Sequence, residues 1–271
     1  MSGMSAIVET FARCRKEKRA AFVPFLVAGD PDLETTGHLV TGLAAAGADV
    51  IELGVPFSDP IADGPVNQEA ANRALASGTT LAGILATVAA LRPRVDVPIV
   101  LFTYFNPIHA YGIARFADHA ARSGVDGVLA VDLPPEEAAG EYLERCEESG
   151  IDPIFLLAPT STKERIRAVA AHGRGFVYYV SRTGVTGSEG ALPAGLAREV
   201  KALRRKLALP LAVGFGISTP EQAREVAKLA DGVGVGSALV RTIAGSAGAP
   251  DLVERVTRQA GELARACRRK R

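Results

Sequence analysis

Short runs of apolar residues, most of them nearly continuous rather than alternating with polar ones, recur along the chain. They read AFVPFLVAG from Ala21, DVIELGVPF from Asp49, PIVLFTYF from Pro98, GVLAVDLP from Gly127, PIFLLAP from Pro153, FVYYVS from Phe176, PLAVGFGI from Pro210 and GVGVGSAL from Gly232. Strands covered on both faces have this composition because neither face meets water. The pattern therefore predicts eight buried parallel strands.

Between these runs lie stretches with helical spacing of their apolar residues. They read DLETTGHLVTGLAAAG, LAGILATVAALR, PPEEAAGEYLERCEESG, TKERIRAVAAHG and TPEQAREVAKLADG. Several begin at Asp, Thr or Pro and end on Gly, as helices commonly do. Eight such βα units without a linker predict a single (β/α)8 TIM barrel over residues 1–271, with an extra N-terminal helix, Glu9 to Lys18, as a lid. An open doubly wound sheet is the structural alternative.

Composition and charge narrow the class of protein. The 271 residues are 48% hydrophobic and 23% charged, with a net charge of +1, which fits a globular chain and excludes disorder. A near-neutral chain has no broad positive field for nucleic acid or an anionic membrane. Three scattered cysteines indicate reduced thiols, and no apolar run suggests a signal peptide or a membrane span. We expect a cytoplasmic protein whose basic C-terminal tail is a solvated helix end rather than a nucleic-acid patch.

Two glycine clusters follow the last two predicted strands, where barrels commonly bind phosphate. One is GFGIS, Gly214 to Ser218, and the other places Gly236 and Ser237 at the start of a helical segment. Glycine lets backbone N–H groups approach an anion, and a helix start supplies further donors. Each cluster alone would more often relieve crowding in a tight turn. Together, at both expected positions, they predict a phosphate site.

Three acidic residues lie within the second predicted strand and in the loop after it. Glu52 lies within the apolar run VIELGV, and the local sequence offers it no Arg or Lys. Burial should raise its pKa, so that it can donate and accept a proton near neutrality. Asp59 and Asp63 follow in the loop PFSDPIADGPVNQ. We expect one of them to fold over the pocket that Glu52 faces; the alternatives are a hydrogen-bonded structural Glu52 and aspartates that serve only as turn or cap residues.

Several kinds of chemistry are disfavoured by what the strand ends lack. No predicted strand ends in lysine, and Lys163 begins a helix, which argues against a Schiff-base aldolase. The four histidines lie far apart, so no metal is expected, and His109 is interpreted as structural. What remains is phosphate binding combined with carboxylate acid–base chemistry in a pocket with an apolar lining. The candidate residues of that lining are Phe25, Phe102, Tyr104, Leu129, Tyr178 and Phe215. The glycine-rich stretch VSRTGVTGSEGALP predicts a closing lid, or else an ordinary connection.

Six motifs, in order, resemble the tryptophan synthase alpha subunit family. They are PFLVAGDP, IELGVPFSDPIADGP, VLAVDLPPEE, SRTGVTG, GFGIS and GVGSA, and the similarity runs from Phe22 to the final helix. The resemblance implies a retro-aldol cleavage of indole-3-glycerol phosphate to indole and glyceraldehyde 3-phosphate. Two positions depart from the family pattern, Val27, which is often Thr, and Phe102, which is commonly aliphatic.

The resemblance also implies roles for individual residues and a partner. It makes Glu52 and Asp63 the catalytic carboxylates and Tyr178 the pocket tyrosine. It places Phe25, Tyr104, Leu129 and Phe215 on the indole pocket, Gly187, Gly216, Gly236 and Ser237 on phosphate, and Thr186 on the lid near Asp63. The family needs no cofactor in this chain and docks on a pyridoxal-phosphate beta subunit in an alpha2beta2 complex. Another phosphate-binding barrel of the same pathway, or a barrel that mainly activates a partner, are the rival interpretations.

Overall fold

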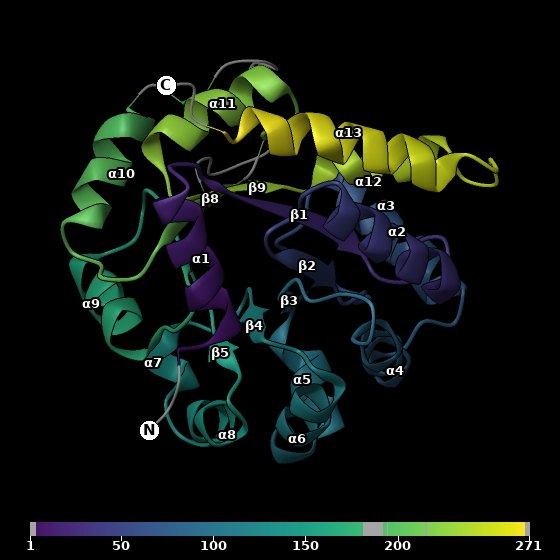
Figure 1. Cartoon of the computed structure of the whole chain (residues 1–271). Coiled ribbons are helices and arrows are strands. Elements are labelled where there is room, and N and C mark those ends of the chain that lie inside the picture. Colours follow the sequence, from purple (N-terminus) through teal and green to yellow (C-terminus); the bar gives the residue numbers. More distant parts are fainter. Residues whose placement is uncertain (1–3, 181–191, 194, 215, 269–271) are drawn as a thin grey trace.

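A computed structural model describes residues 4–180, 192–193, 195–214 and 216–268. Its strands are all parallel and form a nearly closed barrel with helices outside it (Figure 1). The described strands are β1 Ala21–Val27, β2 Ile51–Gly54, β3 Ile99–Thr103, β4 Gly127–Ala130, β5 Asp152–Pro153, β6 Phe155–Leu157, β7 Val177–Val180, β8 Leu211–Gly214 and β9 Gly232–Val235. The predicted TIM barrel is confirmed: β1 pairs with both β2 and β9, and the two end strands, β5 and β6, follow each other directly in the chain, so the sheet curves into a nearly closed barrel.

The fifth predicted strand is present as two short strands, β5 and β6. In the strand order, β5 and β6 stand at opposite ends, with β1 and β9 between them. No ladder pairs β5 with β6 among the described strands, and Ile154 connects the two along the chain. The N–H of Ile154 donates to the carbonyl of Val128, 2.8 Å away, which keeps the interrupted run attached to β4. Pro153 has no N–H to continue the ladder, which is the physical reason for the break.

Most of the helices cover the outside of the barrel, singly or in pairs between strands, whereas the first helix precedes the first strand (Figure 1). Those described are α1 Ala6–Lys16, α2 Leu33–Ala45, α3 Pro65–Ala76, α4 Leu81–Leu91, α5 Phe105–Tyr111, α6 Ile113–Ser123, α7 Pro135–Ala138, α8 Glu141–Ser149, α9 Lys163–His172, α10 Leu196–Arg204, α11 Pro220–Leu229, α12 Ser237–Gly245 and α13 Leu252–Ala266. The predicted helix from PPEE to EESG is divided into α7 and α8 at Gly140, whose φ of 101° ends the first helix. Within the described residues no single helix is long and apolar enough to cross a membrane, and α3 with α4 reach that length only as a pair bent by 92°.

The extra N-terminal helix lies at the end of the barrel where the strands begin. It starts earlier than expected, at Ala6, because the Ser5 side chain accepts the N–H of Val8 and caps it. Its Phe11 ring packs against Phe176 at 5.3 Å between ring centroids and lies 3.0 Å from where a Cβ at Gly232 would be. This helix therefore closes the bottom of the barrel and is not a lid over the mouth.

Three aspartates at the bottom repeat one arrangement. Each precedes a strand, accepts a backbone N–H from a neighbouring strand and binds an arginine side chain. The sets are Asp49 with Phe22 and Arg19, Asp126 with Ile99 and Arg92, and Asp231 with Leu211 and Arg204. These contacts join neighbouring strands where they begin, which leaves the opposite end of the barrel to the loops.

A column of aromatic side chains fills the barrel interior from bottom to mouth. Phe176 follows Phe11, and Tyr178 lies 6.4 Å above Phe176 between ring centroids. Phe102 meets Tyr178 edge-on at 6.2 Å, and Phe25 meets Phe102 edge-on at 5.2 Å. Aromatic rings bury large apolar areas, so the interior is packed up to the level of Phe25 and Phe102.

Candidate active site

Glu52 lies in the middle of β2 and points into the barrel. Its neighbours Ile51 and Leu53 belong to the core between the sheet and the helices, so alternation along the strand turns Glu52 inward. The residue is 0% exposed, and within the described part of the chain neither carboxylate oxygen has a hydrogen-bond partner. Burial raises the pKa of Glu52 well above its ordinary value. The described residues thus offer Glu52 no hydrogen bond, and burial shifts its side chain toward the protonated form.

Asp63 lies on the loop that joins β2 to α3. The Tyr104 hydroxyl donates to its Oδ2 at 2.9 Å, and the Asn67 side-chain amide donates to its Oδ1 at 3.5 Å. Burial raises the pKa of Asp63, and these two hydrogen bonds lower it, with burial the largest effect. Asp59 differs, because its exposed carboxylate accepts from the adjacent Ser58 hydroxyl, as in an ordinary turn. Of the two loop aspartates, only Asp63 reaches the pocket.

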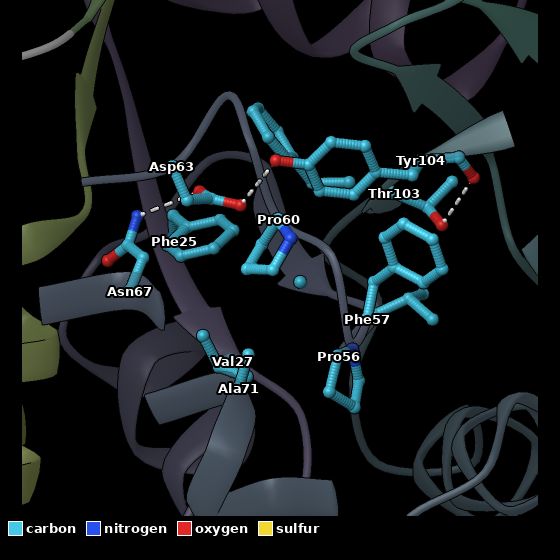
Figure 2. Close-up of a pocket in the computed structure, with 13 residues that line it drawn as sticks. Phe25, Val27, Pro56, Phe57, Pro60, Asp63, Asn67, Ala71, Thr103 and Tyr104 are labelled. Atoms are coloured by element: carbon cyan, nitrogen blue, oxygen red, sulfur yellow. Dashed lines mark hydrogen bonds between the residues drawn. The ribbon is translucent and has the colours of Figure 1, made fainter. Parts of the chain in front are cut away.

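A pocket of about 320 Å³, open in part to solvent, lies at the ends of β1, β2 and β3. Figure 2 shows the side chains around it, with Asp63 and Asn67 at one end. The lining consists of Phe25, Val27, Gly54, Val55, Pro56, Phe57, Pro60, Asp63, Asn67, Ala71, Phe102, Thr103 and Tyr104. A mostly apolar wall with a few polar groups at one end suits a flat aromatic ligand that carries a hydrogen-bond donor.

Two aromatic rings lie between Glu52 and this pocket. A Cβ at Gly54 would come within 2.7 Å of the Phe25 ring, so that ring covers the next inward-facing position of β2 after Glu52. Phe102, on the next strand, packs edge-on against Phe25. The structure thus brings Phe25, Phe102, Tyr104 and Asp63 together in one pocket but leaves the Glu52 carboxyl below it.

Tyr178 lies inside the barrel near Glu52, and both burial and the charge of Glu52 raise the pKa of its hydroxyl. Its ring extends across β8 and β9: Cβ atoms at Gly214 and Gly234 would lie 1.9 and 2.6 Å from the hydroxyl oxygen. Gly214 and Gly234 therefore relieve steric crowding, since they leave room for the Tyr178 side chain. Leu129 is buried in the same interior cluster and does not line the pocket.

The remaining phosphate candidates lie at the start of α12 and after β8. Ser237 begins α12, Gly236 precedes it, and both are half-buried. The first turn of a helix has backbone N–H groups without intrahelical acceptors, which favours an anion there. Gly216 is exposed with a φ of 77°, a conformation that favours glycine. Thr186, Gly187 and Phe215, with the rest of the predicted lid, lie outside the described residues, so those predictions stay predictions.

The histidines and the lysine that were weighed for metal and Schiff-base chemistry lie within the described part of the chain. In that part of the chain, no group of three or more His, Cys, Asp or Glu side chains is placed to hold a metal ion. His109 is exposed on α5 beside Phe105, and Lys163 begins α9, as expected. The polar chemistry of the described pocket therefore comes from Asp63 and the amide and hydroxyl groups around it.

Two residues of this site were not among the sequence candidates. Asn67 binds the Asp63 side chain, and the Gln68 side chain donates to the Asp63 carbonyl at 2.8 Å. The signal was present in the loop motif, because an amide pair follows Asp63 by four and five residues, at the start of a helix with Pro65 in its first turn. Such side chains fold back on the preceding loop, as capping residues do.

Together, the nearly closed barrel, the buried acid on β2 and the second acid beside an aromatic pocket define a (β/α)8-barrel protein with two carboxyl side chains near one pocket. Sequence comparison supplies the family: the model for the tryptophan synthase alpha chain matches residues 11–268, and the chain belongs to that family.

Individual relatives cover nearly the whole chain. The tryptophan synthase alpha chain of Citrifermentans bemidjiense is 59% identical, over 88% of this chain and 89% of that one. The alpha chain of Pelobacter propionicus is 51% identical, over 97% and 98%. Among solved structures, a Mycobacterium tuberculosis tryptophan synthase chain superposes with a TM-score of 0.90 at 37% identity, covering 99% of this chain and 100% of that one.

Proposed function

We propose that this chain is the alpha subunit of tryptophan synthase and cleaves indole-3-glycerol phosphate to indole and D-glyceraldehyde 3-phosphate. The observation that carries the proposal is the fully buried, unpartnered carboxyl of Glu52, just below a flat apolar pocket with Asp63 at its edge. Burial that raises the pKa of this carboxyl favours its protonated form, which is the acid this reaction needs. The family membership of the chain supports the same reaction.

The reaction begins with a proton. Glu52 donates to C3 of the indole ring, while the Asp63 carboxylate accepts the ring N–H and stabilises the positive charge. The bond between C3 and the side chain then breaks, and its electron pair restores the aromatic ring. The ionised Glu52 removes the proton from the hydroxyl on the carbon next to the ring, which becomes the aldehyde. Glu52 ends protonated, and positioned proton transfer of this kind contributes about 10²- to 10⁴-fold in rate.

Binding must also open the path to Glu52. Because the Phe25 and Phe102 rings lie between that carboxyl and the pocket, the incoming indole has to displace at least one of them. The phosphate at Gly216, Gly236 and Ser237, together with Gly187 and Thr186 of the predicted lid, supplies binding energy far from the reacting carbon. Tyr178 and Leu129 of the barrel interior, which do not line the pocket of the ligand-free chain, would complete the ring-binding wall with Phe215 once the ring has entered, and the reaction needs no cofactor in this chain.

The released indole is apolar and would escape, which gives a reason for a partner. We propose docking on the pyridoxal-phosphate beta subunit in an alpha2beta2 complex, where indole condenses with serine. The loop from Pro56 to Pro60 and the Asn106 region are the proposed contacts. Ile61, next to that loop, has an 88% exposed side chain, as expected of a residue that a partner covers.

An indole-release assay tests the proposal. Wild-type chain is incubated with indole-3-glycerol phosphate, with and without a beta subunit, beside the Glu52→Gln and Asp63→Asn variants. We expect indole from wild type, more of it with the beta subunit, and at least 100-fold less from either variant. Near-full turnover by a folded Glu52→Gln or Asp63→Asn chain contradicts the assigned roles, and no indole under any condition contradicts the function.

A further inference from the structure

The Tyr104 hydroxyl makes two hydrogen bonds, and both go to the loop that carries Asp63. It accepts the backbone N–H of Ala62 at 2.9 Å and donates to Asp63 Oδ2 at 2.9 Å. The Tyr104 ring also packs against Phe57 of the same loop, with 5.2 Å between ring centroids. A single side chain at the end of β3 therefore contacts the loop at Phe57, Ala62 and Asp63. Figure 2 shows the hydrogen bond between Tyr104 and Asp63.

These contacts give the two oxygens of the Asp63 carboxylate different surroundings. Oδ2 accepts a hydrogen bond of ordinary length from Tyr104, whereas the donor found for Oδ1 among the described residues is Asn67, at 3.5 Å. A bond at that distance is weak. Each carboxylate oxygen can accept two hydrogen bonds, so Oδ1 keeps its acceptor capacity for a ligand.

Tyr104 has the rigidity that such a contact needs. Its side chain is 4% exposed, and it precedes the first residue of α5, so the strand and the helix both fix its backbone. The loop from Val55 to Gly64 has no regular structure of its own and includes the exposed Ser58 and Asp59. Within that segment the Asp63 N–H donates to the carbonyl of Pro60 at 3.0 Å, and Tyr104 adds a hydrogen bond to the Asp63 carboxylate from a neighbouring strand.

We infer that Tyr104 is a positioning residue, whose hydroxyl turns the Asp63 carboxylate so that Oδ1 accepts the ring N–H of the bound indole. This inference rests on the proposed function and adds to it, since the family resemblance gives Tyr104 only a place in the pocket wall. A lining role depends on the ring. A positioning role depends on the hydroxyl.

The Tyr104→Phe variant separates the two roles, because it keeps the ring and removes the hydroxyl. Loss of a hydrogen bond to the ionised carboxylate raises the pKa of Asp63, so the acid limb of the pH profile of kcat/KM moves to higher pH. We expect a shift of about 0.5 to 1 pH unit and a loss of about 10- to 100-fold in kcat/KM at neutral pH from misplacement. Tyr179→Phe is the matched control, since the Tyr179 hydroxyl donates to Glu199 at 2.8 Å on the outer side of β7.

Titration of the Asp63 carboxyl by ¹³C NMR in the ligand-free chain completes the experiment. An Asp63 pKa that is higher in Tyr104→Phe but not in Tyr179→Phe supports the inference. This result is independent of indole release: if wild type released no indole, only the proposed function would be contradicted. Unchanged Asp63 titration and an unchanged pH profile in a folded Tyr104→Phe chain overturn the inference. If Tyr104→Phe fails to fold, Phe57→Leu is used, which removes the ring contact and leaves both hydrogen bonds. The inference then predicts an unshifted Asp63 pKa, and a shift as large as 0.5 unit overturns it.

Discussion

The hydroxyl oxygen of Tyr178 occupies the space where a Cβ at Gly214 would lie, 1.9 Å from that position. The same oxygen lies 2.6 Å from the Cβ position of Gly234 on the next strand. Two glycines thus form the recess that holds Tyr178 next to Glu52. Glycine is required at both positions because the Tyr178 side chain occupies the space that any larger side chain would need.

Gly214→Ala should displace Tyr178 and so disturb both stability and activity. Overpacking a filled interior costs about 1 to 3 kcal/mol of unfolding free energy. The double variant Gly214→Ala with Tyr178→Phe should recover only the part of that loss that the hydroxyl causes, because the ring atoms Cζ and Cε1 would still lie 2.4 and 2.8 Å from the new Cβ. Gly245→Ala is the control, since nothing lies within 4 Å of its Cβ position. Equal stability of Gly214→Ala and wild type would contradict the recess.

Glu52→Gln should stabilise the chain in a pH-dependent way. Burial raises the pKa of Glu52, so the folded chain binds the proton more tightly than the unfolded chain. Between the ordinary value of 4.5 and the raised value, the unfolding free energy contributed by Glu52 therefore falls as pH rises. We expect the melting temperature of Glu52→Gln to exceed that of wild type above about pH 5, and the difference to vanish at lower pH. The exposed Glu262→Gln should show no such trend, and a parallel trend would argue against a desolvated Glu52.

Asn67→Leu should raise the stability of the chain and weaken its binding of substrate. The side-chain carbonyl oxygen of Asn67 is buried without a hydrogen-bond partner among the described residues, and the neighbouring residues of α3 pack on Phe25 and Val27. Removing an unsatisfied buried group should raise the unfolding free energy by on the order of 1 kcal/mol. Loss of the amide near Asp63 should at the same time raise KM for indole-3-glycerol phosphate. A destabilised variant with unchanged KM would contradict both expectations.

Gly236→Asp should weaken substrate binding through its charge. The new carboxylate would stand at the start of α12, where the phosphate is proposed to bind, and we expect KM to rise at least about 10-fold. Gly236→Ala separates charge from size, because its Cβ would lie 3.2 Å from the Phe25 ring. If the alanine variant raises KM as much as the aspartate variant, the effect is steric and the anion site is elsewhere.

Phe11→Ala should destabilise the chain and leave its kinetics unchanged. Phe11 is 3% exposed and packs at the bottom of the barrel, at the opposite end from the pocket. Truncating a buried phenylalanine costs about 3 to 5 kcal/mol. We expect a lower melting temperature but a KM within about 2-fold of wild type at temperatures where the variant is folded. A large change in KM would mean that the two ends of the barrel are coupled.

The sequence by itself determined the barrel and its acid. Nearly continuous apolar runs can be stable only as strands covered on both faces, and their alternation with amphipathic stretches leaves few other arrangements. A carboxylate inside such a run, as Glu52 is, must be buried wherever the strand is placed. The burial of Glu52 and the helix start at Ser237 therefore followed from local pattern alone.

Only the tertiary structure decided how the side chains around these groups meet. Nothing in the local pattern could show that the Phe25 ring crosses to Gly54 and covers Glu52, or that the Tyr104 hydroxyl reaches the loop of Asp63 from another strand. Those contacts join residues far apart in the chain. Their geometry depends on strand register and on the volume of neighbouring side chains, which local sequence patterns do not encode.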